Sequence, residues 1–266
     1  MDGGAGFWGR IWEGFAGILW GEFCGVRAGL RRRGCLTEIA TFLAGFARFQ
    51  AKYFQEQPEL FARLRQSQSP RAMVIACCDS RVDPAMLMGA DPGDMFVVRN
   101  VANLVPPYRN GAEMPGIRAD IEFGVKGLNV EHIIVLGHSS CGGIRALMDG
   151  EGITENHYEF IGAWVSIARQ ARERVLRELG GETEAVRTKA CEQWAISLSL
   201  DNLQSFPWIH ERVEAGTLAL HGWYFDMDAG ELLGYRAETA SFAALVAGPR
   251  FARAKREGSV EDELLG

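Results

Sequence analysis

The sequence predicts an α/β fold: a mostly parallel β-sheet flanked by helices, with an N-terminal helical arm. Between residues 72 and 149, short aliphatic runs alternate with segments of helical periodicity, which is typical of parallel βαβ units. Before them, apolar residues recur at helical spacing over residues 37–66, which predicts two helices separated at Gln57-Pro58. Residues 37–235 contain no internal repeat, so we expect one domain there.

The same patterns place the individual elements. We expect strands at 72–77, 95–99 and 131–137, and helices at 84–89, 117–129 and 142–148. Two longer helices follow at 157–179 and 184–205, and Pro207 prevents the second from continuing. Residues 217–224 form a strand, and Asp228-Ala229-Gly230 predicts a hairpin return after it.

Composition excludes several classes of protein. The chain has 266 residues, of which 47% are hydrophobic and 23% charged, enough apolar material for a core. A formal charge of −6 gives no electrostatic reason to expect a nucleic-acid partner. No apolar run reaches the roughly 18 residues of a transmembrane helix. The six cysteines argue for a reducing compartment rather than a disulfide framework, and we expect a cytoplasmic protein.

We expect three segments: an N-terminal extension at 1–36, a domain at 37–240 and a C-terminal tail at 241–266. The extension has apolar residues at helical spacing, weakened by glycines and followed by arginines. An arm packed on a partner subunit is the preferred interpretation. A membrane-surface helix, a targeting peptide and a natural start downstream of Met1 remain open.

Two motifs follow apolar runs and together suggest a metal site. Cys77-Cys78-Asp79-Ser80-Arg81 follows the first run, and His138-Ser139-Ser140-Cys141-Gly142-Gly143 follows another. Open α/β sheets bind ligands at the carboxyl ends of their strands. Cys77, His138 and Cys141 could hold one zinc ion, and three protein ligands leave the open position of a catalytic site. The alternative is that Cys77 and Cys141 are buried structural thiols.

These motifs resemble the C-x-D-S-R and H-x-x-C motifs of the β-class carbonic anhydrases, in their plant-type branch. The resemblance covers about residues 46–235 and includes Gln68-Ser69-Pro70, the run from Phe96 to Leu104, Ile121-Glu122-Phe123-Gly124-Val125 and His221-Gly222-Trp223-Tyr224. It implies a zinc lyase (carbonate dehydratase) with one zinc per chain that reversibly hydrates carbon dioxide to bicarbonate and a proton.

The resemblance also implies a role for each site residue. Asp79 would orient the reacting water and Arg81 would hold Asp79. The substrate would contact Gln68, the apolar residues Phe96, Val101 and Phe123, and the backbone N–H of Gly142. The family forms homodimers with the pocket at the subunit interface, which often pair into tetramers.

Two other functions remain open at this point. The first is hydrolysis of carbonyl sulfide or carbon disulfide on the same scaffold. The second is a non-catalytic zinc protein that senses bicarbonate or acts as a scaffold. Cys78 is expected to be a small buried residue, and the remaining histidines, among them His132 and His221, are expected to be structural or solvated.

Overall fold

The computed structural model describes residues 32–109, 115–150 and 159–249. The chain divides into two compact units, Met1–Gln66 and Ser67–Gly266, each treated separately below. Residues 1–31 of the N-terminal extension lie outside the described residues, so its interpretations remain predictions. The boundaries expected at 36 and 240 also remain predictions.

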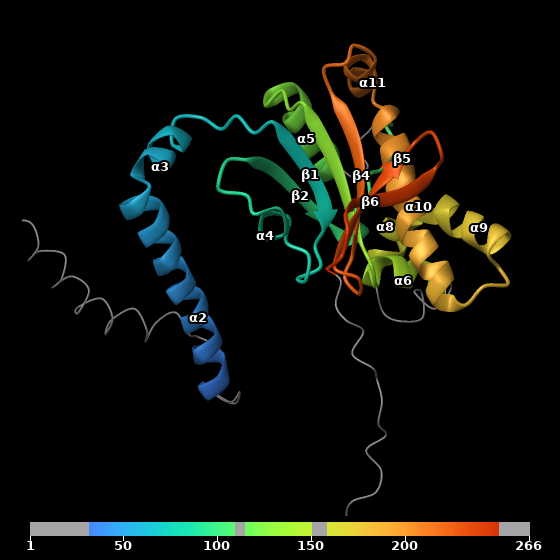
Figure 1. The fold of residues 1–266 in the computed structure, drawn as a ribbon, viewed down its shortest axis with the longest axis horizontal. Helices are drawn as coiled ribbons and strands as arrows, with labels where there is room; N and C mark the ends of the chain where they lie inside the picture. Colours follow the sequence, from blue (N-terminus) through green and yellow to red (C-terminus); the bar gives the residue numbers. More distant parts are fainter. Residues whose placement is uncertain (1–31, 110–114, 151–158, 250–266) are drawn as a thin grey trace, which may run out of the picture. The chain divides into compact units, whose positions relative to one another are not determined.

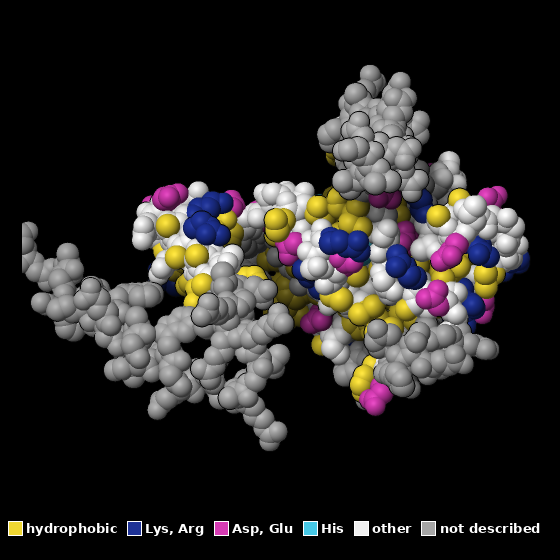
Figure 2. Space-filling view, turned by 90° about the horizontal axis from the view of Figure 1, so that it is seen from below, with side chains coloured by type: hydrophobic (Ala, Val, Ile, Leu, Met, Phe, Trp, Pro, Cys, Tyr) yellow, Lys and Arg dark blue, Asp and Glu magenta, His cyan; other side chains and the backbone are white. Residues whose placement is uncertain are grey.

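The first unit consists of α2 (Arg32–Gln50), a π-helical turn η1 (Ala51–Glu56) and α3 (Pro58–Leu64). Pro58 is the first residue of α3, where its missing N–H costs no helical hydrogen bond. The rings of Phe54 and Phe61, 4.6 Å apart, pack α3 against η1. Figure 2 shows hydrophobic side chains at the surface of this unit. The exposed hydrophobic residues of α2 are Ile39, Phe42, Leu43 and Phe46.

The second unit is built on a six-stranded mixed sheet with the order β2-β1-β3-β4-β5-β6 (Figure 1). Its strands are β1 (Ala72–Cys77), β2 (Met95–Asn100), β3 (His132–His138), β4 (Ala219–Asp226), β5 (Glu231–Arg236) and β6 (Ser241–Val246). The first four pair in parallel, whereas β5 and β6 are antiparallel to their neighbours. The expected α/β class and the hairpin after β4 are therefore confirmed. Strand β6 was not expected, and it continues the sheet beyond residue 240.

The helices of this unit are α4 (Pro84–Met88), η2 (Val101–Asn103), α5 (Pro115–Glu122) with the π-helical turn η3 (Phe123–Gly127), α6 (Gly142–Asp149), α8 (Ile161–Val165), η4 (Ser166–Ala168), α9 (Arg169–Glu178), α10 (Glu184–Gln204) and α11 (Pro207–Glu214). The single helix expected at 157–179 is wrong: Ala168, at φ −93° and ψ 17°, separates α9 from the preceding turns. Helix α11 was not predicted. No helix among the described residues is long and apolar enough to cross a membrane.

Helix α10 packs closely against the centre of the sheet because two strand positions there, Gly137 of β3 and Gly222 of β4, carry no side chain. Ile196 of α10 is fully buried and lies over Gly137 of β3. A Cβ atom at residue 137 would come within 2.6 Å of Ile196 Cδ1 and 2.9 Å of Ile196 Cγ1. This contact sets the distance between α10 and the end of β3, where His138 follows.

We expect Gly137→Ala to lower the free energy of unfolding by about 1–3 kcal/mol, because a packed core resists added volume. Gly116→Ala is the matched control, since a Cβ atom there would meet nothing within 4 Å. The control should stay within about 1 kcal/mol of wild type. Urea unfolding at fixed protein concentration measures both, and equal stability of the two variants would contradict the close packing.

Candidate metal centre

Cys77 is the last residue of β1, and its side chain is 4% exposed. The strand pairing ends just after it, where the N–H of Cys78 donates to the Asn100 carbonyl at 3.0 Å. Cys78 itself is exposed, so the expectation that it is buried is wrong. Strand alternation turns its side chain away from that of Cys77, but alternation alone does not bury a residue that follows the end of a strand.

His138 is the last residue of β3, and a short loop leads from it to Cys141, the N-cap of α6. Ser140 adopts φ 58° in this loop. Helix α6, which begins directly after this loop, approaches η2 so closely that a Cβ atom at its second residue, Gly143, would lie 2.6 Å from Val101 Cγ1. Glycine at this position therefore lets the start of α6 lie against η2.

The structure brings Cys77, His138 and Cys141 together, and all three are buried. Their ligand atoms lie within 4.8 Å of one another, with the two sulfur atoms 4.0 Å apart. The Cys141 thiol, hydrogen-bonded to the Cys77 sulfur, lowers the pKa of Cys77. That interaction and burial raise the pKa of Cys141.

The orientation of the His138 ring is fixed by the loop. Its Nδ1 lies 2.9 Å from the Ser139 carbonyl, which can only accept a hydrogen bond, so Nδ1 carries the proton. In the neutral ring Nε2 is then the nitrogen with the free lone pair, and it is buried with no hydrogen-bond partner among the described residues. A buried nitrogen lone pair facing two sulfur atoms is the donor arrangement of a metal ligand.

The donor set fits zinc. Two thiolates about 2.3 Å from a tetrahedral zinc would be about 3.8 Å apart, close to the observed sulfur separation. Two cysteines and one histidine are also the ligands of known catalytic zinc sites, which keep one position open. Cys77, His138 and Cys141 would therefore hold the ion.

Asp79 and Arg81 form a two-pronged ion pair beside the cysteines. Arg81 donates from Nε to Asp79 Oδ1 at 2.9 Å and from Nη2 to Oδ2 at 2.7 Å. Nη2 also donates to the Ser140 carbonyl at 3.1 Å, which connects the ion pair to the loop between His138 and Cys141. These hydrogen bonds from the Arg81 side chain hold the pKa of Asp79 well below its ordinary value, so the carboxylate is ionised at neutral pH.

Arg99 was missed at the sequence level, although it holds the segment that follows β1 in position. From β2 it donates to the carbonyl oxygens of Cys77 at 3.0 Å and Asp79 at 2.7 Å, and it pairs with Asp83 at 3.1 Å. The backbone around Asp79 is therefore held by a side chain of the neighbouring strand β2. Arg99 falls inside the run from Phe96 to Leu104, but its spacing does not reveal a role because two of its three partners are backbone carbonyls.

Glu192 of α10 and Tyr224 of β4 were also missed at the sequence level. They hold the loop between His138 and Cys141 in position. The Cys141 N–H donates to Glu192 Oε1 at 2.9 Å, and the Tyr224 hydroxyl donates to Oε2 at 2.7 Å. Glu192 is 4% exposed and Tyr224 fully buried. Burial raises the pKa of Glu192, and the two hydrogen bonds oppose this shift. The only signal in the sequence was a glutamate on the core side of the helix expected at 184–205.

The expected substrate residues are divided between the two ends of the sheet. Gly142 follows Cys141, and Val101 lies against the start of α6, so both lie beside the metal ligands. Phe96 pairs with Met73, four residues before the Cys77–Asn100 pair, about 13 Å away along the strand. Phe123 packs on Phe96 with ring centroids 5.8 Å apart, and Gln68 precedes β1. One chain does not bring these three residues to its own metal ligands.

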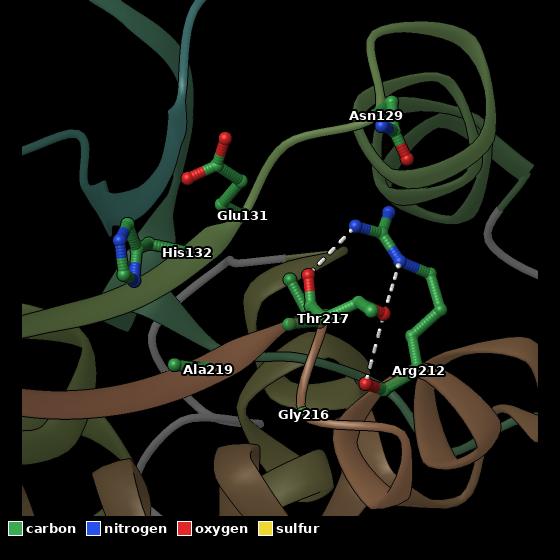
Figure 3. Close-up of a pocket in the computed structure, with 8 residues that line it drawn as sticks. Asn129, Glu131, His132, Arg212, Gly216, Thr217 and Ala219 are labelled. Carbon is green, nitrogen blue, oxygen red and sulfur yellow. Dashed lines mark hydrogen bonds between the residues drawn. The ribbon is translucent and has the colours of Figure 1, made fainter.

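A cavity of about 540 Å³ lies at the amino ends of β3 and β4, at the opposite end of the strands from the metal ligands (Figure 3). In Figure 3, Arg212 reaches Thr217, and it also donates to the carbonyls of Val125 and Val130 at 3.0 and 2.9 Å. Its guanidinium therefore closes the turn before β4. His132 of β3 lines the cavity, and its Nδ1 lies 3.2 Å from Nε2 of His221 on the neighbouring strand β4. These are structural contacts, and we assign no chemistry to them.

Comparison with known proteins gives consistent matches. Residues 72–232 match the family model described as carbonic anhydrase. Beta carbonic anhydrase 5, chloroplastic, of Arabidopsis thaliana is 41% identical over 68% of the chain, which spans 59% of that relative's length. Beta carbonic anhydrase 3 of the same plant is 37% identical over 73% of the chain and 76% of its own length.

Solved structures agree. The β-carbonic anhydrase CcaA, 32% identical, superposes with a TM-score of 0.73 over 78% of this chain and 99% of its own. A structure of the tetrameric β-carbonic anhydrases of Sordaria macrospora, 29% identical, gives a TM-score of 0.66 over 74% of this chain and 96% of its own.

The contacts of Glu192 generate a prediction about the metal. We expect Glu192→Gln to weaken zinc binding about tenfold or more, because one amide oxygen replaces two acceptors and Cys141 loses its fixed position. Competition with a chelator measures the affinity. Gln193→Ala, the next residue on α10, is the control and should bind zinc as wild type does. Unchanged affinity in Glu192→Gln would contradict the role of this contact.

Proposed function

The chain belongs to the β-carbonic anhydrase family, and from that premise we propose that it catalyses the reversible hydration of carbon dioxide to bicarbonate and a proton, with one zinc ion per chain. The observation that carries the proposal is the buried group of Cys77, His138 and Cys141, with an unpartnered His138 Nε2, next to an ionised Asp79. A zinc ion bound there would act as a Lewis acid and lower the pKa of a coordinated water.

Asp79 would orient the reacting water. Oδ1 accepts hydrogen bonds from the backbone N–H and from Nε of Arg81, whereas Oδ2 accepts only one, from Nη2, and so keeps a second lone pair. An ionised carboxylate in a fixed position can therefore accept a hydrogen bond from the water and direct the water's oxygen at the carbon of the substrate. Asp79 does not belong to the group of ligand atoms within 4.8 Å of one another, so we propose that this is the open form of the site.

Gly142 would contact the product. It is the first residue of α6, and its N–H is one of those that have no partner within the helix. The positive end of the helix dipole favours an anion such as bicarbonate at this position. Val101, which lies against the start of α6, would supply the apolar wall that suits carbon dioxide.

The remaining pocket residues support a homodimer or a larger homo-oligomer. Gln68, Phe96 and Phe123 lie at the far end of the strands from Cys77, and Phe123 is 49% exposed. In a dimer with twofold symmetry the same patch of each chain can reach the other chain's metal site. We propose that these three residues complete the site of a second copy. The exposed hydrophobic side chains of α2 and the tetramers described for the Sordaria proteins support an assembly of this kind.

Neither alternative function is carried further. Every relative named above is described as a carbonic anhydrase, which supports neither hydrolysis of carbonyl sulfide or carbon disulfide nor a non-catalytic role. The cytoplasmic location remains a prediction, and the first relative named above is described as chloroplastic. Cys77, Cys78, Cys141 and Cys191 form no disulfide.

The direct test of the function replaces each of the two adjacent cysteines by serine, one at a time. Cys77→Ser should lose both zinc and carbon dioxide hydration, because a hydroxyl binds zinc far more weakly than a thiolate. Cys78→Ser is the matched control, and since its side chain is exposed it should keep both. Metal analysis and a hydration assay on the same samples measure the outcome. Full zinc and full activity in Cys77→Ser would refute the site.

The shared pocket is tested by mixing two variants. Gln68→Ala and Asp79→Asn should each be nearly inactive. If the two residues of one site come from different chains, half of randomly mixed dimers are hybrids in which one of the two sites is intact, so about a quarter of wild-type activity returns.

The control for this experiment is a mixture of Asp79→Asn with Cys77→Ser. These two residues lie on the same loop, so every hybrid site carries one of the changes and no activity should return. Co-expression of the pairs followed by the hydration assay makes the comparison. Equal activity in the two mixtures would show that each site belongs to a single chain.

A further inference from the structure

A second cavity of about 420 Å³ lies apart from the metal ligands and carries positive charge. Three arginines from three separate segments line it: Arg109 after η2, Arg118 on α5 and Arg169 at the start of α9. Among the described residues that line the cavity there is no Asp or Glu. Arg109 and Arg169 form no ion pair within the described parts of the chain. Such a cavity favours an anion.

The segment that carries Arg109 is held in place by hydrogen bonds on both sides. Asn202 of α10 donates to the Val105 carbonyl at 2.7 Å, and Arg118 donates to the Pro107 carbonyl at 3.0 Å. The Tyr108 N–H donates to Ser205 Oγ at 2.8 Å. The wall of the cavity therefore exists before a ligand binds, which lowers the entropic cost of binding.

The rest of the lining is apolar or neutral. Pro106, Pro107, Ile167 and Leu198 provide an apolar surface, and the side-chain amides of Gln170 and Asn202 provide neutral hydrogen-bonding groups. A cavity of this size lies in the range of small-molecule sites and is much larger than bicarbonate or phosphate alone requires. Its ligand should combine a multiply charged anionic group with an organic part.

We propose that this cavity binds a small phosphomonoester. A phosphate group presents three acceptor oxygens and nearly two negative charges at neutral pH, which suits several guanidinium groups better than a single carboxylate does. The sugar or glycerol part would lie on the prolines, Ile167 and Leu198. The proposal rests on the cavity alone and is independent of the proposed hydration activity.

The test uses the full chain loaded with zinc and calorimetric titration with glucose 6-phosphate. Glucose and inorganic phosphate are the comparison ligands. We expect binding of glucose 6-phosphate, none of glucose, and weaker binding of inorganic phosphate. No binding of glucose 6-phosphate would overturn the proposal, and equal binding of inorganic phosphate would overturn the organic part of it.

Variants locate the binding site. Arg109 and Arg169 are exposed, so the pair of substitutions Arg109→Gln and Arg169→Gln should leave the fold intact and weaken binding about tenfold or more. Arg177→Gln, also on α9 but outside the cavity, is the control for a lost positive charge and should bind as wild type does. Binding that is unchanged in the double variant, or lowered equally in the control, would place the phosphate elsewhere, for example at the metal, and would overturn the proposal.

Discussion

The parallel pairing of β1 with β3 is the constraint on which the candidate site depends. Their register, with Ala76 opposite Leu136, brings the ends of the two strands to the same edge of the sheet. Strand β2 lies on the other side of β1, so the chain leaves β1 and β3 in opposite directions, which is the topology at which open α/β sheets bind their ligands. A slip of one residue would turn every side chain of a strand to the opposite face and would separate His138 from both sulfur atoms.

Burial makes the hydrogen bonds around the metal ligands costly to lose. Glu192 has a donor for each of its oxygens, and His138 Nδ1 has the Ser139 carbonyl. His138 Nε2 has no hydrogen-bond partner among the described residues, a cost of about 1–3 kcal/mol for a buried polar atom. A ligand for this atom would therefore stabilise the fold as well as complete the site, so that metal binding and folding stability are coupled.

The sequence contained the metal ligands but not their supports. Cys77, His138 and Cys141 were predictable because each motif directly follows an apolar run, and parallel strands end at one edge. Arg99 and Glu192 act through backbone atoms of distant loops, so no spacing reveals them. The exposure of Cys78 was mispredicted because alternation gives the direction of a side chain and not what covers it. Helix α11 and strand β6 were missed for a different reason: each is short and follows directly on another element.

The separation of Phe96 and Phe123 from Cys77 has a consequence for inheritance. With a pocket shared between two copies as proposed, a chain altered at both Gln68 and Asp79 would spoil both sites of any dimer it joins, since it supplies one faulty residue to each. A cell that makes equal amounts of normal and doubly altered chains would then retain activity only in its purely normal dimers, about a quarter of the total. An allele of this kind would be dominant, whereas the same two changes in an enzyme with self-contained sites would be recessive.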